Sequence, residues 1–292
     1  MLDISFLDTL SRLKLAMGHK SSLNLSGNRK SLQKGSSTEF SDFREYMPGD
    51  DIRRIDWNAY GRLDRLYIKE YMEEKEMLVR ILLDTSASMN YNASSKKELA
   101  EKLAASFAFI ALNHMDRVQI YDLRRPETPF LATGGRKALP RMLDWLDRLE
   151  FTGTVNLSEA LPKLSLQGSG VTIIISDFLQ EDFVDASSVA PSRLLRYLQY
   201  KKQKTLLLQV LAEEELRVTL TGTLKLIDME DDSSLRLTME NKSIQTYEKA
   251  LKAFRERLQK ETAKAGAAYA LCDTGMSFNQ LIFQELRFAY DI

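Results

Sequence analysis

The sequence of 292 residues contains very little cysteine or histidine. Its one cysteine, Cys272, cannot form a disulfide within the chain, which fits a reducing compartment. Because Cys272 ends the apolar run AAYALC, we expect it in the core and not as a nucleophile. The two histidines, His19 and His114, are far apart in the sequence and lack the spacing of metal ligands. A disulfide-bonded scaffold is therefore excluded, and a histidine-based metal site is not expected.

Long apolar runs and net charge are also lacking. No apolar stretch near the N-terminus resembles a signal peptide, and runs such as VTIII are far shorter than the about 20 residues of a membrane-spanning helix. The 41 basic and 41 acidic side chains balance, which argues against nucleic acid as the main partner, since phosphate binding needs a net basic surface. We therefore expect a cytoplasmic protein with no membrane span and no nucleic-acid partner.

The residue pattern changes near residue 76, which predicts two regions. Residues 1–75 would form an N-terminal extension, with an amphipathic helix over residues 2–17 and a polar loop over 18–38. The stretch that follows is dense in aromatic and charged residues without a helical period, which indicates turns and short strands. Residues 76–292 alternate apolar runs with helical periodicity, which is typical of an α/β domain.

The apolar runs of the second region predict its fold class. Strands are expected for MLVRILLD, DRVQIYDL, VTIIISD, KTLLLQVL and AAYALCD. Strands of continuous apolar character separated by helices indicate an α/β, doubly wound, mostly parallel sheet with helices on both faces. Two alternating runs within residues 216–239 predict antiparallel strands at the sheet edge, and SFNQLIFQELRFAY predicts a last helix.

Oxygen-bearing side chains follow two of these strands. Asp84, Ser86 and Ser88 come directly after a buried strand, in ILLDTSASM, and Asp177 ends VTIIISD. Thr154 follows Gly153 just before a predicted helix. Ligands of parallel sheets bind beyond the carboxyl ends of the strands, and all-oxygen donor sets suit Mg²⁺ or Mn²⁺. The sequence therefore predicts a site for a divalent cation at this edge of the sheet.

This arrangement resembles the von Willebrand factor A domain and its metal-ion-dependent adhesion site, whose pattern is D-x-S-x-S, a Gly-Thr turn and an apolar strand ending in Asp. The resemblance implies Ser86, Ser88 and Thr154 as hydroxyl ligands, with Asp84 and Asp177 acting directly or through water. It also implies that an acidic side chain of a partner protein completes the coordination of Mg²⁺ or Mn²⁺. One departure is Val155, which intervenes before Asn156, so that Thr152 is an alternative to Thr154.

The segment that precedes the first predicted strand indicates a more specific family. Residues 46–57, YMPGDDIRRIDW, are similar to the signature of the bacterial domain-of-unknown-function family number 58. That family is often encoded beside MoxR-type AAA+ ATPases, which implies such an ATPase, or a client of it, as a partner. Two interpretations of the signature stay open. It is a structural turn with ion pairs and a core tryptophan, or Arg53, Arg54 and the nearby acids form a partner-facing surface.

Other functions compete with a non-enzymatic adhesion module. Asp84, Ser86 and Ser88 can also act as turn and helix caps, which would leave a structural protein without a metal. An aspartate at a strand end with Mg²⁺ is also found in phosphatases of the haloacid dehalogenase type, but Ser86 occupies the position of their second, proton-donating aspartate. No catalytic residue is assigned, and a Mg²⁺-dependent phosphatase is the alternative to the adhesion module.

Overall fold

The structure is a computed structural model, and it describes residues 4–15, 38–73, 76–185, 187–218, 222–227, 234–239 and 241–291. The chain divides into two compact units, one of residues 25–76 and one of residues 1–24 and 77–292. The sequence pattern placed residues 1–75 together in an N-terminal extension. In the structure, residues 1–24 group with the α/β unit instead.

A six-stranded sheet forms the centre of the α/β unit, with the strand order β11-β8-β7-β4-β5-β6. Its strands are β4 (Leu78–Leu83), β5 (Arg117–Asp122), β6 (Phe130–Ala132), β7 (Gly170–Ser176), β8 (Gln203–Leu211) and β11 (Ala268–Asp273). All neighbours pair in parallel except β5 and β6, which are antiparallel. The expected mixed α/β class with a mostly parallel sheet is thus confirmed.

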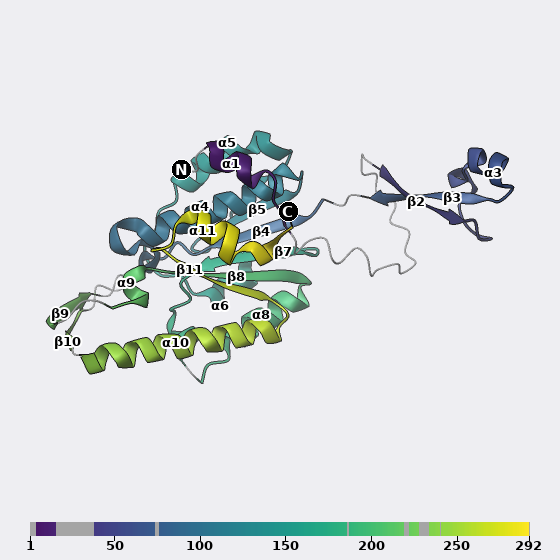
Figure 1. Ribbon diagram of the computed structural model, residues 1–292. Coiled ribbons are helices and arrows are strands. Elements are labelled where there is room, and N and C mark those ends of the chain that lie inside the picture. Colours follow the sequence, from purple (N-terminus) through teal and green to yellow (C-terminus); the bar gives the residue numbers. More distant parts are fainter. Residues whose placement is uncertain are drawn as a thin grey trace. The chain divides into compact units, whose positions relative to one another are not determined.

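Helices cover both faces of this sheet (Figure 1). One face carries α1 (Ile4–Leu10), α4 (Tyr91–Asn113), α5 (Leu139–Asp147) and α11 (Phe278–Gln280). The other face carries α6 (Leu157–Ala160), α8 (Ala190–Tyr200) and α10 (Asn241–Lys264). Short helices α7 (Glu181–Val184), α9 (Glu213–Leu216), η2 (Ala87–Asn90), η3 (Gly135–Ala138) and η4 (Leu161–Lys163) lie in the connections.

Strand β4 shows why its sequence is continuously apolar. Ile81 and Leu83 belong to the core cluster on the α4 face, and Leu82 belongs to the cluster on the α8 face. Successive side chains of a strand point to opposite faces, so a strand that is covered on both sides needs apolar residues at every position. All three side chains are 0% exposed. This double coverage packs β4 between the two core clusters of the α/β unit.

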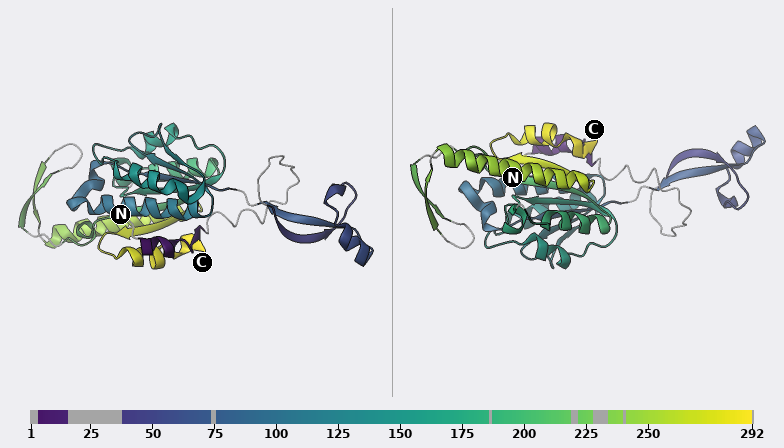
Figure 2. Two further views of the ribbon diagram at one scale, coloured as in Figure 1. Left: turned by 90° about the horizontal axis from the view of Figure 1, so that it is seen from above. Right: turned by 90° about the horizontal axis from the view of Figure 1, so that it is seen from below.

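Two expectations, for the N-terminal helix and for the antiparallel strands, are wrong in detail. The helix expected over residues 2–17 ends at Leu10 and is followed by strand β1 (Lys14–Leu15), which pairs with β12 (Tyr290–Asp291). Strands β9 (Gly222–Ile227) and β10 (Ser234–Met239) form their own two-stranded sheet and do not extend the main sheet, whose edges are β11 and β6. This hairpin lies beyond the first residues of α10 (Figure 2).

The expected last helix is also broken into short turns. Helix α11 passes into a π-helical segment, η5 (Leu281–Glu285), and then into η6 (Arg287–Ala289) before β12. The buried side chains of Leu281, Ile282 and Leu286 explain the break, because all three reach the core cluster. The loop expected over residues 18–38 lies outside the described residues, except for its last residue.

The unit of residues 25–76 is built on a hairpin of β2 (Thr38–Glu45) and β3 (Tyr67–Glu73). The connection between the two strands contains η1 (Ile52–Arg54) and α3 (Trp57–Leu63). Ile55 forms an antiparallel bridge with Ile68 and is buried, so the connection packs back onto β3. The helix α3 begins at a side-chain cap, because Asp56 accepts hydrogen bonds from the backbone N–H groups of Asn58 and Ala59.

A charged side chain lies inside the β4 region of the core. Arg80 is 1% exposed, and its guanidinium donates to Gln203 Oε1 at 2.7 Å and to the backbone carbonyl of Gln167. Its Nε has no hydrogen-bond partner, and within the described part of the chain no carboxylate lies within ion-pair distance of it. Burial lowers the pKa of Arg80 from its ordinary value, because the charged form is desolvated.

We expect Arg80→Met to leave the free energy of unfolding unchanged or to raise it by about 1 kcal/mol, because a buried cation without a counter-ion is replaced by an apolar chain of similar length. Gln203 Oε1 keeps its hydrogen bond from Thr172 Oγ1, and Gln167 lies in an exposed loop where water can replace the guanidinium. Urea denaturation measures the change. Arg80→Ala is the contrast, since its cavity should cost about 2 kcal/mol or more.

Candidate metal site at the carboxyl edge of the sheet

Four parallel strands end in aspartate at the same edge of the sheet. Asp84 follows β4, Asp177 follows β7, and Asp122 and Asp273 are the last residues of β5 and β11. All four are buried. Strands β4 and β7 are neighbours, yet the chain leaves β4 toward α4 on one face and β7 toward α8 on the other. Asp84 and Asp177 therefore flank a topological switch point, where parallel sheets commonly bind ligands.

Three of these carboxylates have a basic partner. Lys96 Nζ lies 2.9 Å from Asp177 Oδ2, Arg217 Nη2 lies 3.6 Å from Asp273 Oδ2, and Arg124 Nη2 lies 3.9 Å from Asp122 Oδ2. Asp84 differs from the others, because no basic side chain of the described residues lies within ion-pair distance of it. Its partners are neutral. Ser176 Oγ donates to Oδ2 at 2.6 Å, and the Ser86 backbone N–H donates to Oδ1 at 3.0 Å.

Asp84 is 0% exposed, so its negative charge is both buried and uncompensated. Burial, and then the negative charge of Asp177, raise the pKa of Asp84 to about 6, although the hydrogen bonds from Ser176 and Ser86 act in the opposite direction. A buried carboxylate of this kind is stabilised either by a proton or by a cation. A positive charge bound beside Asp84 would therefore stabilise the folded protein.

Two hydroxyls lie in the turn that follows Asp84. Ser86 Oγ and Ser88 Oγ are 3.0 Å apart, so the alternating positions converge as the sequence pattern predicts. Ser86 is buried and Ser88 is half-buried at the start of η2. The turn is held against the neighbouring loop, because the Ala87 backbone N–H donates to the Gly153 carbonyl at 2.8 Å. One carboxylate and two hydroxyls therefore share a small, well-supported volume.

The loop of residues 152–154 packs on this turn. The Thr152 backbone N–H donates to the Thr85 carbonyl at 3.0 Å, and Gly153 adopts a positive φ of 66° that favours glycine. Arg124 clamps the same two segments, since it donates to Thr85 Oγ1 at 3.2 Å and to the Thr152 carbonyl at 3.1 Å. Both threonines of the loop are exposed, but Arg124 donates to the Thr152 hydroxyl, so Thr154 is the better candidate ligand.

The departure from the adhesion-site pattern after Thr154 has a structural reason. Val155 is buried in the core cluster on the α8 face. Asn156 caps α6, because its side chain accepts a hydrogen bond from the Glu159 backbone N–H at 3.2 Å. The inserted valine therefore anchors the loop, and Asn156 starts the helix.

Asp177 occupies the other side of the switch point, and both of its carboxylate oxygens are already bound. Oδ2 accepts from Lys96 Nζ, and Oδ1 accepts from the Leu179 backbone N–H at 3.1 Å. Lys96 also reaches Glu215 Oε1 at 3.0 Å. Burial lowers the pKa of Lys96, but the charges of Asp177 and Glu215 outweigh it and raise the pKa above its ordinary value. Asp177 is thus part of a buried three-residue ion pair.

The five predicted residues meet at one edge of the sheet, but they do not have equal status. Asp84, Ser86 and Ser88 have oxygens that fit a hard cation, and Thr154 lies on the adjoining loop without a described partner for its hydroxyl. Asp177 fits an indirect role, because Lys96 holds it. No group of three His, Cys, Asp or Glu side chains in the described ranges is arranged to hold a metal, so a cation here would rely on hydroxyls and on outside ligands.

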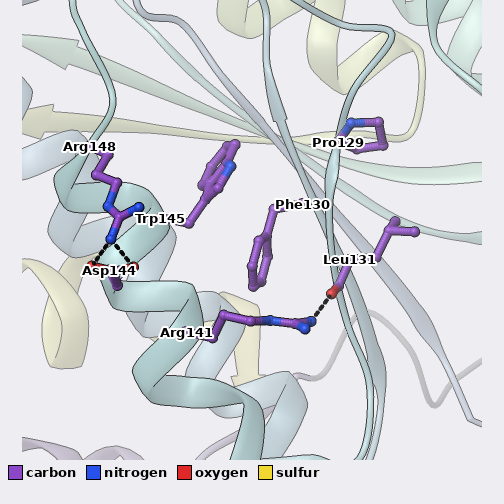
Figure 3. A pocket seen from close by; sticks show the side chains of 7 residues that line it. All are labelled: Pro129, Phe130, Leu131, Arg141, Asp144, Trp145 and Arg148. Atoms are coloured by element: carbon purple, nitrogen blue, oxygen red, sulfur yellow. Dashed lines mark hydrogen bonds and ion pairs between the residues drawn. The ribbon is translucent and has the colours of Figure 1, made fainter.

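A shallow cavity of about 530 Å³ lies elsewhere, beside the edge strand β6. It is lined by Pro129, Phe130, Leu131, Arg141, Asp144, Trp145 and Arg148 (Figure 3). The rings of Phe130 and Trp145 lie 5.5 Å apart, and Arg141 donates to the Leu131 carbonyl at 2.9 Å. Arg148 pairs with Asp144. None of the predicted ligands lines this cavity, so it is separate from the candidate metal site.

One comparison, with models of protein families, identifies the family. The model of the family described as "Protein of unknown function DUF58" matches residues 42–257. An uncharacterized protein of Mycobacterium bovis and two of Mycobacterium tuberculosis strains are each 30% identical to this chain over 103 residues. The match spans 35% of this chain and 32% of each relative, about a third of the relatives' length.

A comparison of backbone structures finds two solved proteins with a similar chain path. One is an aerotolerance-related membrane protein from Bacteroides fragilis with multiple mutations to serines, with a TM-score of 0.39 and 15% identity over 73% of this chain and 99% of that chain. The other is the conserved hypothetical protein BatB from Bacteroides thetaiotaomicron, with a TM-score of 0.43 and 16% identity over 73% and 98%. In this chain, the described helices include none that is both long and apolar enough to cross a membrane.

Proposed function

Because the chain belongs to the family of proteins of unknown function DUF58, whose model matches most of its length, we propose a function from its own site. The protein is a non-enzymatic interaction module. It binds a partner carboxylate through a divalent cation, Mg²⁺ or Mn²⁺, at the carboxyl edge of the sheet, in the manner of the adhesion site of von Willebrand factor A domains. The partner is a MoxR-type AAA+ ATPase or a protein that such an ATPase remodels.

One observation carries the proposal: Asp84 is fully buried, lacks a basic partner among the described residues and lies beside two convergent hydroxyls. The other buried aspartates of this edge are each compensated by a lysine or an arginine. A divalent cation bound by Asp84, Ser86 and Ser88 would supply the missing charge, and oxygen ligands are those that Mg²⁺ prefers. Three protein oxygens do not fill an octahedral shell, which leaves positions for water and for a partner carboxylate.

The binding step has a direct test on the purified chain. We expect Mn²⁺ to bind in calorimetric titration, and Ser88→Ala to weaken its affinity by about tenfold, because one hydroxyl ligand is lost while the buried turn is kept. Asp144→Asn is the matched control, since Asp144 lies at the exposed cavity beside β6 and should not change the affinity. The absence of any Mn²⁺ binding to the native chain contradicts the proposal.

The carboxylate step and the alternative function need separate measurements. Partner capture with a MoxR-type ATPase as the probe should require the cation, and excess chelator should abolish it. A phosphatase assay with generic phosphoesters and Mg²⁺ should show no turnover that depends on Asp84. Robust Asp84-dependent hydrolysis would instead favour the phosphatase, and capture that survives the chelator would remove the metal from the interaction.

A further inference from the structure

The acidic residues of the PGDDIRRIDW segment have structural tasks in the unit of residues 25–76. Asp50 accepts from the Met47 backbone N–H at 2.9 Å and pairs with Arg44 at 2.9 Å. Asp51 caps η1 by accepting from the Arg53 backbone N–H at 3.1 Å, and it pairs with the side chain of the same arginine. Asp56 caps α3. Asp50 and Asp51 therefore each pair with one arginine, and Asp51 and Asp56 each cap a helix.

Most of the large apolar side chains of residues 47–63 are instead exposed. Met47, Ile52, Trp57, Tyr60 and Leu63 are 65%, 63%, 64%, 41% and 60% exposed, and we call them the Trp57 patch. Trp57 contacts the ring of Tyr60 at a centroid distance of 6.2 Å. The buried side chains of this connection are smaller, Ile55 and Ala59 among them. The interpretation of Trp57 as a core residue is thus wrong.

The charge around the Trp57 patch is asymmetric. Arg54 and Arg62 have no carboxylate within ion-pair distance among the described residues, whereas Glu45 is paired with Arg65 at 3.1 Å. Arg62 Nε donates to the Asn58 carbonyl at 3.3 Å, so its guanidinium folds back toward the first turn of α3, where Trp57 lies. The exposed Asp64 closes the helix at its opposite end. Two arginines near the Trp57 end of α3, Arg54 and Arg62, therefore lack an ion pair among the described residues, although the charge of Asp51 also attracts Arg54.

We propose that the Trp57 patch is the docking surface for a segment of a partner protein that combines apolar anchors with acidic side chains. Trp, Tyr, Met and Arg are the residues enriched at protein interfaces and at their energetic hot spots. The apolar anchors would cover Trp57, Ile52 and Leu63, and the acids would pair with Arg54 and Arg62. A lipid surface is a different occupant, and the vesicle measurement below distinguishes it from a peptide.

The test is a library of random short peptides displayed on phage and selected against the whole chain. Peptides enriched by the native chain should carry aspartate or glutamate next to apolar residues. We expect Trp57→Ala to weaken their binding by about 10- to 100-fold, and a double Arg54→Glu, Arg62→Glu variant to weaken it by about tenfold or more. Tyr200→Ala is the control, because Tyr200 is 80% exposed on α8 and lies outside the Trp57 patch.

Other occupants of the Trp57 patch give different results, and each would overturn the proposal. Equal retention of the peptides by Trp57→Ala, or enrichment of basic peptides, contradicts the assigned chemistry. Patch-dependent binding to phosphatidylglycerol vesicles indicates a membrane, and patch-dependent dimerisation in sedimentation indicates a second copy of the chain. In a Trp145→Phe background, weak acrylamide quenching of Trp57 in the free chain means that the chain itself covers the patch. A circular dichroism spectrum shows whether each variant is folded.

Discussion

Lys96→Met lowers the free energy of unfolding by about 3–5 kcal/mol, the expected cost of removing one partner from a buried ion pair. The Lys96 side chain is 0% exposed and the Asp177 side chain is 3% exposed, so solvent cannot replace the lost ammonium. Methionine keeps the apolar stem, which separates the loss of charge from the loss of packing. Urea denaturation followed by Trp145 fluorescence, in a Trp57→Phe background, measures the change in the α/β unit.

Two further variants distinguish a charge effect from general damage. Lys252→Met replaces an exposed lysine of α10 and should leave stability unchanged within about 0.5 kcal/mol. Lys96→Met combined with Asp177→Asn and Glu215→Gln should regain most of the loss, because no unpaired buried charge remains. A single Lys96→Met variant as stable as Lys252→Met would refute the role of the ion pair.

Asp84→Asn is expected to have the second large effect on the free energy of unfolding. Whether it raises or lowers this free energy depends on whether a divalent cation is present. Without divalent metal at neutral pH, the variant is more stable than the native chain by about 1–3 kcal/mol, because a buried charge is removed. The amide can keep both hydrogen bonds: its oxygen accepts from the Ser86 N–H, and its nitrogen donates to Ser176 Oγ. With Mg²⁺ at a hundredfold excess over its dissociation constant, the native chain gains about 2.7 kcal/mol, and the variant gains nothing.

The pH dependence follows from the direction of the pKa shift. Because the folded state raises the pKa of Asp84 from 3.8 to about 6, folding favours the protonated carboxyl. The favourable contribution is fully present below about pH 4 and is lost as the pH rises through about 6. The stability difference between Asp84→Asn and the metal-free native chain should therefore grow across this range, as thermal denaturation at a series of pH values can show. A difference that does not vary with pH contradicts the assignment.

Much of the fold follows from the periodicity of the sequence. The runs MLVRILLD and VTIIISD are doubly covered strands, so nearly every residue had to be apolar, and their ends could be located to within a residue. Asp84 and Asp177 were predicted at the same edge because parallel neighbours end together. The short edge strand β6 was not predicted, since its three residues carry no period of their own.

Lys96 was missed, although a signal exists. It lies at helical spacing with Ala100, Leu103 and Phe107, all of which are buried, so a lysine occupies the core-facing stripe of α4. The adjacent Lys97 hides this signal, because a pair of lysines at the start of a helix is typical of a solvated face. Its partner Glu215 could not be identified, since EEEL offers three equivalent acids and only the tertiary structure selects one.

A core tryptophan at residue 57, one of the two interpretations left open for its segment, is excluded for a different reason. A tryptophan between an aspartate cap and a short helix is usually buried, because its ring contributes more apolar area than most side chains. The connection in this unit buries Ile55 and Ala59, whereas the Trp57 side chain is 64% exposed. Sequence patterns describe which residues can be buried, but the size of the available core decides which of them are.

The membership of α1 and β1 in the α/β unit has a practical consequence. The chain starts in one unit, leaves it for residues 25–76 and returns, so that the smaller unit is a cassette within the larger one. A cassette of this kind can be excised and its flanks rejoined by a short flexible linker, because the strands of the central sheet all lie downstream of it. Such a deletion would retain the cation-dependent stabilisation while removing the Trp57 patch, and the transplanted cassette would carry peptide binding to another host protein.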